Sequence, residues 1–237
     1  IERLLADDVF TVTTGHQCCL LGGPMYFIYK IISVVKLAVI AEKNGVKAVP
    51  IFWMATEDHD FEEINHCWIG ENKLTWDSEQ NGAVGRFNLS EISPVLNELK
   101  SHFKFQDQKL DLIKDLEEIY SPAKTLSEAT RDLCYYLFGA LGIVVLDADD
   151  AELKGVFRES IKQELKGSIS YAPVLKTSEK LKDMKLTTQV NPREINLFWL
   201  EEGVRSRIES NGSGFNTVDN HKAWQHEELL ELVDASP

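Results

Sequence analysis

Two clusters of polar residues in this sequence could carry chemistry. The first is Thr14-Gly15-His16-Gln17, which is followed by the glycine pair Gly22-Gly23. Glycines let backbone N–H groups approach a phosphate, and the start of a helix carries a partial positive charge. His16 could also donate a hydrogen bond to negative charge that develops in a transition state. The cluster favours an anion site, although a tight turn whose polar residues only satisfy backbone groups explains it equally well.

The second cluster is acidic. Residues 57–66 hold five acids, two histidines and an asparagine, directly after an apolar run. His59 could serve as an acid or base that a neighbouring carboxylate orients. Alternatively, Asp58, His59, Asp60 and His66 could hold a divalent metal, or the acids could bind an ammonium group or sugar hydroxyls. A capped loop without chemistry is a further interpretation.

Three other side chains near the first cluster need an interpretation. Lys30 lies one helical turn after Tyr26, and it could reach an anion near the helix start or extend into solvent. Cys18 and Cys19 suggest a thiol mechanism, but no adjacent base is identifiable in the sequence. We therefore expect these cysteines to be buried and inert.

A strand–helix–strand pattern positions both polar clusters. Residues 10–13 and 48–55 are strand-like, and a helix runs between them from Pro24 to about Asn44. The helix is apolar nearly all round, so we expect most of it to be buried, together with both strands. The short connections favour a βαβ unit, and ligands bind at the carboxyl ends of its parallel strands. The pattern predicts an α/β fold with both clusters at one edge of the sheet.

Later segments continue this fold and interrupt it. Residues 142–147 form a third apolar strand that ends in acids, with a helix on each side. Residues 71–124 differ, because alternating segments such as 83–89 predict antiparallel hairpins and an amphipathic helix covers about 106–120. This stretch is interpreted as an insertion into the sheet domain.

Charge and composition restrict the partners. The 237 residues include 25 Lys and Arg against 38 Asp and Glu, a net charge of −13. This balance argues against duplex nucleic acid, whose affinity comes largely from phosphate neutralisation by cations. The longest apolar stretch, residues 31–41, is too short to span a bilayer. The four cysteines show no paired spacing, which favours reduced thiols in the cytoplasm.

Several segments together carry a family resemblance. They are Thr14–Gln17, Gly23–Lys30 and Val49–His66, and residues 142–147 and 223–225 fit the same pattern. These segments closely resemble the cysteine-adding enzyme of bacillithiol biosynthesis, the BshC family. The likeness covers the whole chain. One departure is Cys18-Cys19, where relatives are expected to carry Pro-Gly or Leu-Cys, and this bears on the shape of the turn.

The resemblance implies a Rossmann-like parallel sheet core with inserted connecting modules, similar to class I aminoacyl-tRNA synthetases and nucleotidylyl transferases. The expected parts are residues 1–70, the first half of the core; 71–124, an inserted connecting module of hairpins and helices; 125–168, the continuation of the core; and 169–237, a second connecting module that is truncated. Family chains are longer and dimerise through a C-terminal coiled coil. We therefore expect this chain to be an internal fragment, inactive by itself, of a cytoplasmic homodimer.

The resemblance also implies a reaction. A ligase of this family adds L-cysteine to glucosaminyl malate and forms an amide, a carbon–nitrogen bond. ATP is the expected activating cosubstrate, and no metal is expected beyond magnesium with ATP. The partners are small molecules, with no nucleic acid and no membrane.

By analogy with these relatives, the first cluster holds nucleotide phosphates and the acidic segment lines the acceptor pocket. The expected catalytic residues are His16, Asp58, His59 and Asp60. The expected nucleotide-binding residues are Thr14, Gly15, Gln17, Gly22, Gly23 and Lys30. The expected substrate-binding residues are Tyr26, Trp53, Glu57, Asn65 and His66.

Two other functions stay open from the residues alone. A metal-dependent hydrolase could use the segment from Asp58 to His66. The acidic surface could instead belong to a non-catalytic binding module.

Overall fold

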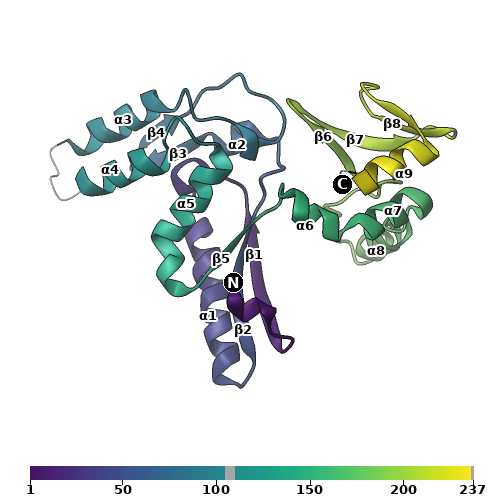
Figure 1. Cartoon of the computed structure of the whole chain (residues 1–237), viewed down its shortest axis with the longest axis horizontal. Coiled ribbons are helices and arrows are strands. Elements are labelled where there is room, and N and C mark those ends of the chain that lie inside the picture. Colours follow the sequence, from purple (N-terminus) through teal and green to yellow (C-terminus); the bar gives the residue numbers. More distant parts are fainter. Residues whose placement is uncertain (105–109, 236–237) are drawn as a thin grey trace. The chain divides into compact units, whose positions relative to one another are not determined.

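A computed structural model describes residues 1–104 and 110–235 of the chain. These residues form two compact units, Ile1–Asp149 and the residues from Asp150 onward. The first unit holds a parallel sheet, and the second holds an antiparallel sheet of its own (Figure 1). No helix within residues 1–104 and 110–235 has the length and apolar character needed to cross a membrane.

The helices (α), 3-10 helices (η) and strands (β) are bounded as follows. The elements of the first unit are η1 (Glu2–Leu5), β1 (Val9–His16), η2 (Leu20–Gly22), α1 (Tyr26–Lys43), β2 (Lys47–Met54), α2 (Phe61–Ile64), β3 (His66–Ile69), β4 (Asn72–Thr75), η3 (Val84–Arg86), α3 (Ser93–Phe103), α4 (Leu110–Ile119), α5 (Leu126–Phe138), η5 (Gly139–Leu141) and β5 (Val144–Asp147). The elements of the second unit are α6 (Ala151–Val156), α7 (Arg158–Gly167), α8 (Tyr171–Asp183), β6 (Phe198–Glu201), β7 (Val204–Ser210), β8 (Gly214–Thr217), β9 (Ala223–Gln225) and α9 (His226–Ala235).

The parallel sheet has the order β1-β2-β5. His16 at the end of β1 lies opposite Met54 of β2, which lies opposite Asp147 of β5. The central strand β2 carries the near-continuous apolar run, and its Val49, Ile51 and Phe52 are buried. The predicted βαβ unit and the α/β fold class are confirmed.

The prediction that the first strand and most of the first helix are buried is wrong for this chain. α1 buries a single stripe, Phe27, Ile31, Val34 and Ala38, whose spacing of three and four places them on one face. Large apolar residues on its other faces are exposed by 40% or more, namely Tyr29, Ile32, Leu37, Val39 and Ile40. Phe10 of β1 is 65% exposed, and β1 is an edge strand of the described sheet.

One hydrophobic core joins the sheet to the insertion. Phe27 and Phe52 belong to the same buried cluster as Trp76, Leu99 and Leu133. Burying an aromatic or aliphatic side chain of this size stabilises the fold by about 1.5–3 kcal/mol. The inserted residues therefore pack as part of the first unit.

Within the insertion, the hairpin of β3 with β4 is antiparallel. The strand predicted for residues 83–89 is wrong, since they form η3 and an isolated bridge between Asn88 and Thr125. Apolar residues of this segment, among them Val84 and Phe87, are buried in the core without forming a strand. Of the helix predicted for about 106–120, residues 106–109 lie outside the described part, and α4 covers 110–119.

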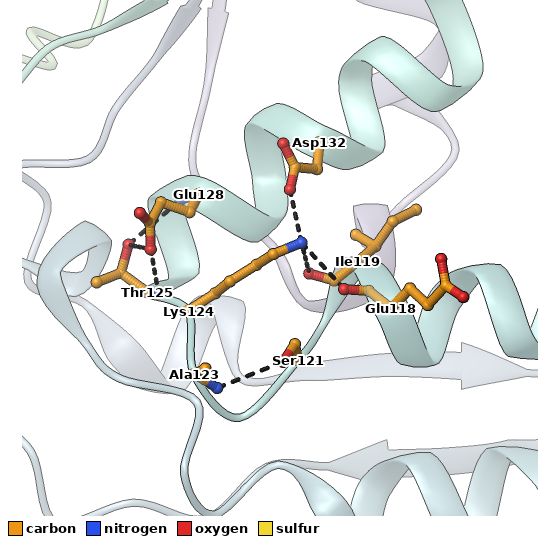
Figure 2. Close-up of polar contacts among 8 residues, drawn as sticks. All are labelled: Glu118, Ile119, Ser121, Ala123, Lys124, Thr125, Glu128 and Asp132. Carbon is orange, nitrogen blue, oxygen red and sulfur yellow. Dashed lines mark hydrogen bonds and ion pairs between the residues drawn. The ribbon is translucent and has the colours of Figure 1, made fainter.

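Lys124 fastens the turn between α4 and α5 (Figure 2). Its Nζ donates to the carbonyl oxygens of Glu118 (3.0 Å) and Ile119 (3.3 Å) and forms an ion pair with Asp132 (2.7 Å). The carbonyls at the end of a helix have no partner within the helix, so a cation here stabilises α4. Thr125 and Glu128 then form a capping box at the start of α5.

The second unit packs helices on the antiparallel sheet β6-β7-β8-β9. Ile208, Phe215 and Trp224 of the sheet share a core with Leu165 of α7 and Leu229 of α9. α6 and α7 thus lie in the second compact unit, whereas the family resemblance implies that residues 125–168 continue the Rossmann-like core. The four predicted domain ranges come from the family's architecture, whereas the two units are defined by compactness. The boundaries of the predicted domains therefore stay a prediction.

Candidate functional site

The candidate site lies at the carboxyl ends of the parallel strands. The backbone N–H of Ala55, directly after β2, donates to the carbonyl of His16 at 2.9 Å, so β1 and β2 stay paired to their ends. The polar residues that follow both strands are consequently neighbours. This is the edge at which open α/β sheets bind ligands.

His16 is a buried, neutral imidazole at the end of β1. His16 is 7% exposed, and the centre of its ring lies 5.0 Å from the centre of the Tyr26 ring and 5.9 Å from that of the Phe27 ring. Nδ1 lies 3.1 Å from the carbonyl oxygen of Gln17. Because a carbonyl only accepts, Nδ1 must be the donor, which leaves Nε2 with a lone pair. Burial lowers the pKa of His16, the hydrogen bond to Gln17 opposes this shift, and the charge of Lys30 adds to it.

Gln17 connects the end of β1 to the acidic segment. Its Nε2 donates to Oδ2 of Asp58 at 2.7 Å and to Oε2 of Glu63 at 2.9 Å. One amide group therefore holds two carboxylates from the segment after β2. The prediction that Gln17 binds nucleotide stays a prediction, and this contact gives it a second role.

We name residues 56–60, directly after β2, the acidic loop. Oδ1 of Asp58 accepts from the backbone N–H of His59 at 2.8 Å and lies 3.6 Å from Nδ1 of the same ring. Nε2 of His59 lies 3.7 Å from Oδ1 of Asp60. The imidazole is half exposed between two carboxylates, which suits proton transfer to or from a small molecule. One ligand atom from each of these three residues lies within 4.8 Å of the others, a spacing that a divalent cation could occupy.

Lys30 points back to the end of β1. Its Nζ donates to the carbonyl oxygen of Gly15 at 3.1 Å and lies 5.7 Å from the centre of the Tyr26 ring. This contact places the ammonium at the strand end, and binding of an anion by Lys30 stays a prediction.

The glycine pair shapes the turn before α1. Gly22 and Gly23 have φ angles of +84° and +55°, which L-residues with side chains rarely adopt. A Cβ on Gly23 would lie 2.4 Å from Cβ of Cys19. Helix α1 begins at Tyr26, so Gly23 precedes the helix start instead of forming it. The observed role of both glycines is conformational, and phosphate binding there stays a prediction.

The cysteines next to this turn are buried. The sequence gives Cys19 no adjacent base, but the fold brings its Sγ to 3.7 Å from Nδ1 of His16. Burial nevertheless raises the pKa of Cys19 to about 11 and that of Cys18 to about 12. Both thiols stay protonated near neutral pH, which supports the interpretation of inert cysteines.

The remaining predicted residues lie around these groups. Thr14 and Gly15 of β1 pair with Phe52 and Trp53 of β2, and a Cβ on Gly15 would lie 3.3 Å from the Trp53 carbonyl oxygen. Glu57 belongs to the acidic loop. Asn65 directly precedes β3 and His66 begins it, and Nδ1 of His66 lies 3.1 Å from Oδ1 of Asn65.

Four polar residues at this edge are absent from the predicted set: Thr56, Arg86, Asp147 and Asp149. Thr56 is fully buried, and its hydroxyl donates to Asp147 at the end of β5 and accepts the backbone N–H of Asp149 at 3.0 Å. The rule that strand ends carry ligands points to the acids after β5. No local sequence pattern indicates that Arg86 belongs to this site, since it lies in a short 3-10 helix of the insertion.

Comparisons with known proteins agree over the whole chain. A family model described as "Bacillithiol biosynthesis BshC, N-terminal Rossmann-like domain" matches residues 1–237. Three similar proteins each bear the name "Putative cysteine ligase BshC". The one from Cytophaga hutchinsonii is 40% identical over 239 residues, which are 100% of this chain and 44% of that protein. The one from Flavobacterium johnsoniae is 43% identical over 239 residues (100% and 45%), and the one from Staphylococcus epidermidis is 30% identical over 251 residues (98% and 46%). The chain thus spans a little under half the length of these relatives.

Proposed function

The chain belongs to the BshC family, and from this membership we propose that it takes part in joining L-cysteine to glucosaminyl malate in bacillithiol biosynthesis. The observation that carries the proposal is the match of the family model to all 237 residues. Because the chain spans under half of its relatives, the activity is proposed for the whole protein.

The geometry of the strand ends supports this function. A ligase must hold an activated carboxylate, an amine and a proton acceptor within one cleft. Here Gln17 joins the end of β1, which carries a neutral imidazole, to the acidic loop, which carries an imidazole between two carboxylates. Two groups able to accept a proton therefore occupy one edge of the sheet.

In the proposed reaction, the amine nitrogen of glucosaminyl malate attacks the carboxyl carbon of cysteine. A C–N bond forms, a C–O bond to the activated carboxyl oxygen breaks, and the amine loses a proton. His59, half exposed and flanked by Asp58 and Asp60, is the proposed acceptor of that proton. The two carboxylates would stabilise the imidazolium that results.

We further propose ATP as the cosubstrate that activates the cysteine carboxylate, accompanied by magnesium. Transfer of AMP or a phosphoryl group to the carboxylate turns a poor leaving oxygen into a good one. Lys30, whose Nζ lies at the end of β1, is the proposed contact for the phosphates. His16 would join it as a donor only with a proton on Nε2, because its Nδ1 already donates to the Gln17 carbonyl. Tyr26, Trp53, Glu57, Asn65 and His66 are the proposed surroundings of the substrates.

The spacing of Asp58, His59 and Asp60 is the observation that favours a metal-dependent hydrolase as a second candidate. The family match supports the ligase instead. Dimerisation of the whole protein and its location in the cytoplasm are proposals that rest on the family alone.

The test uses the whole protein with cysteine, glucosaminyl malate, ATP and magnesium. We expect mass spectrometry to detect the amide, whose mass is that of the two substrates less one water, with ATP consumed in step. Absence of this product, together with unchanged thiol pools in cells that lack the gene, would refute the ligase. Hydrolysis that a chelator abolishes would establish the second candidate.

The site needs a separate test. We expect His16→Ala and His59→Ala to abolish amide formation, while His102→Ala, on α3 of the insertion, serves as the matched control and retains it. Full activity of both site variants would remove the proposed residues but leave the function in place.

A further inference from the structure

We infer that Arg86 is a positioning residue for the proposed reaction: through its ion pair with Asp149 it holds the acidic loop in its reactive geometry. The inference rests on the proposed function and adds a role for the insertion. Arg86 lies in η3 of the insertion, and Asp149 follows β5 of the sheet.

The pair has the geometry of a strong interaction. Nε of Arg86 lies 2.5 Å from Oδ2 of Asp149, and Nη2 lies 2.8 Å from Oδ1. Two parallel N–H donors on one carboxylate fix orientation as well as distance. The Asp149 side chain is 12% exposed and the Arg86 side chain 44%, so solvent screens the pair from the arginine side.

The segment that carries Arg86 is bound directly to the acidic loop. The backbone N–H of Val84 donates to the carbonyl of Asp58 at 2.7 Å, and that of Gly85 donates to the carbonyl of Thr56 at 2.9 Å. The two segments are in close contact, since a Cβ on Gly85 would lie 2.5 Å from Cβ and 2.9 Å from the carbonyl oxygen of Thr56. The backbone that leads into Arg86 is therefore joined to the loop, and Arg86 reaches Asp149 from that anchored position.

The other partner is bound to the same loop. The backbone N–H of Asp149 donates to Oγ1 of Thr56 at 3.0 Å and to Oδ1 of Asp147 at 2.9 Å. The contacts close a ring that runs from Arg86 to Asp149, to Thr56, and back through Gly85. The loop is thus bonded both to the insertion, through Val84 and Gly85, and to Asp149 after β5.

Charge favours the same arrangement. The hydrogen bond to Asp149 raises the pKa of Arg86, and the charges of Asp149, Glu57 and Asp147 raise it further against the opposing effect of burial. Arg86 therefore compensates carboxylates that would otherwise repel one another where the loop leaves β2. Its loss should splay the loop without removing a group that the proposed chemistry uses.

The test measures steady-state kinetics in the whole protein for Arg86→Gln, Arg86→Lys and Asp149→Asn. We expect kcat to fall roughly 100-fold in Arg86→Gln while KM for glucosaminyl malate changes less than about threefold, because displaced groups cost rate more than binding. Asp149→Asn should fall by a similar factor, since it breaks the same pair. Arg86→Lys keeps the charge but not the two-donor geometry, and it should fall by about tenfold.

The matched control is Lys124→Met, which removes another cation and its ion pair from the first unit. This variant should lower the melting temperature but leave kcat within about twofold. A kcat of Arg86→Gln within about threefold of the parent would overturn the inference. An Asp149→Asn protein with parental kcat would overturn it as well, because Arg86 would then act without its partner.

Hydrogen exchange separates this inference from the proposed function, since it needs no substrate. We expect the backbone amides of residues 56–60 to exchange at least about tenfold faster in Arg86→Gln, and at the parental rate in Lys124→Met. If the parent forms no amide, the proposed function fails, while the exchange data still decide the role of Arg86. Equal acceleration in both variants would indicate general loosening and would overturn the positioning role.

Discussion

The side chain of Gln17 donates one hydrogen bond to Asp58 at 2.7 Å, and this contact joins residues 41 positions apart in sequence. It brings the segment after β1 against the segment after β2. The same amide group also reaches Glu63 at 2.9 Å. Gln17 therefore joins the end of β1 to Asp58 of the acidic loop and to Glu63 of α2.

Replacing Gln17 tests this connection. Gln17→Leu keeps the size of the side chain but leaves two carboxylates without their shared donor, so we expect the loop to shift and kcat/KM of the whole protein to fall about 10- to 100-fold. Gln80→Leu is the matched control, because the hydrogen bonds of Gln80 among the described residues lie within the insertion, to Ser78 and Asn88. Parental kcat/KM in Gln17→Leu would contradict the prediction.

The pKa of His16 predicts a dependence of stability on pH. Burial holds this pKa below its ordinary value of 6.5. Below pH 6.5, His16 is therefore protonated in the unfolded chain, while in the folded chain it is still mostly neutral until the pH reaches its lowered pKa. Stability falls as the pH drops from about 6.5 toward the folded pKa, by at most about 1.4 kcal/mol per pH unit.

Urea unfolding at about pH 7.5 and about pH 5.5 measures this effect. His16→Asn keeps a polar group near the Gln17 carbonyl but cannot titrate, so its loss of stability between the two pH values should be smaller than that of the parent. An equal or larger loss in the variant would show that His16 does not cause the pH dependence.

Burial of the four cysteine thiols predicts that they react slowly with a disulfide reagent in the folded protein. Burial raises the pKa of Cys67 to about 11 and that of Cys134 to about 12, similar to the values for Cys18 and Cys19. Because the thiolate is the reactive form, the folded protein should react with a disulfide reagent at about pH 8 at least 100-fold more slowly than the urea-unfolded protein. A single fast thiol that mass spectrometry assigned to Cys19, beside His16, would restore the thiol mechanism.

Local pattern predicts the part of this site that lies within one βαβ unit. The apolar run before Thr56 and the polar residues after Val12 are enough to predict two parallel strands with their ends together, and the structure has that arrangement. Periodicity carries no information about Arg86, because its partner Asp149 is 63 residues away and its own turn is a short 3-10 helix. Such a contact is a property of the packed insertion.

The burial of α1 shows a second limit. A helix that is apolar nearly all round predicts a partner on every face, yet within residues 1–104 and 110–235 only the face with Phe27 and Ile31 is covered. Composition indicates that a helix face is apolar, whereas the element that packs on it is set by tertiary structure, which periodicity does not contain. Tyr29 and Leu37 accordingly stay exposed although they continue the apolar pattern of the helix.

The close approach of Gly85 to Thr56 gives the last prediction. A Cβ at position 85 would lie 2.5 Å from Cβ and 2.9 Å from the carbonyl oxygen of Thr56, distances that real Cβ atoms do not adopt. Gly85→Ala must therefore displace the backbone of the acidic loop, with an expected cost of about 1–3 kcal/mol in the free energy of unfolding. Gly139→Ala is the matched control, since its φ is −55° and a Cβ there would lie 3.8 Å from Tyr135, an ordinary contact. We expect the control to gain up to about 1 kcal/mol, because alanine restricts the unfolded chain. Urea unfolding of both variants measures the difference, and equal stabilities would mean that η3 and the loop are not held in contact as the structure has them.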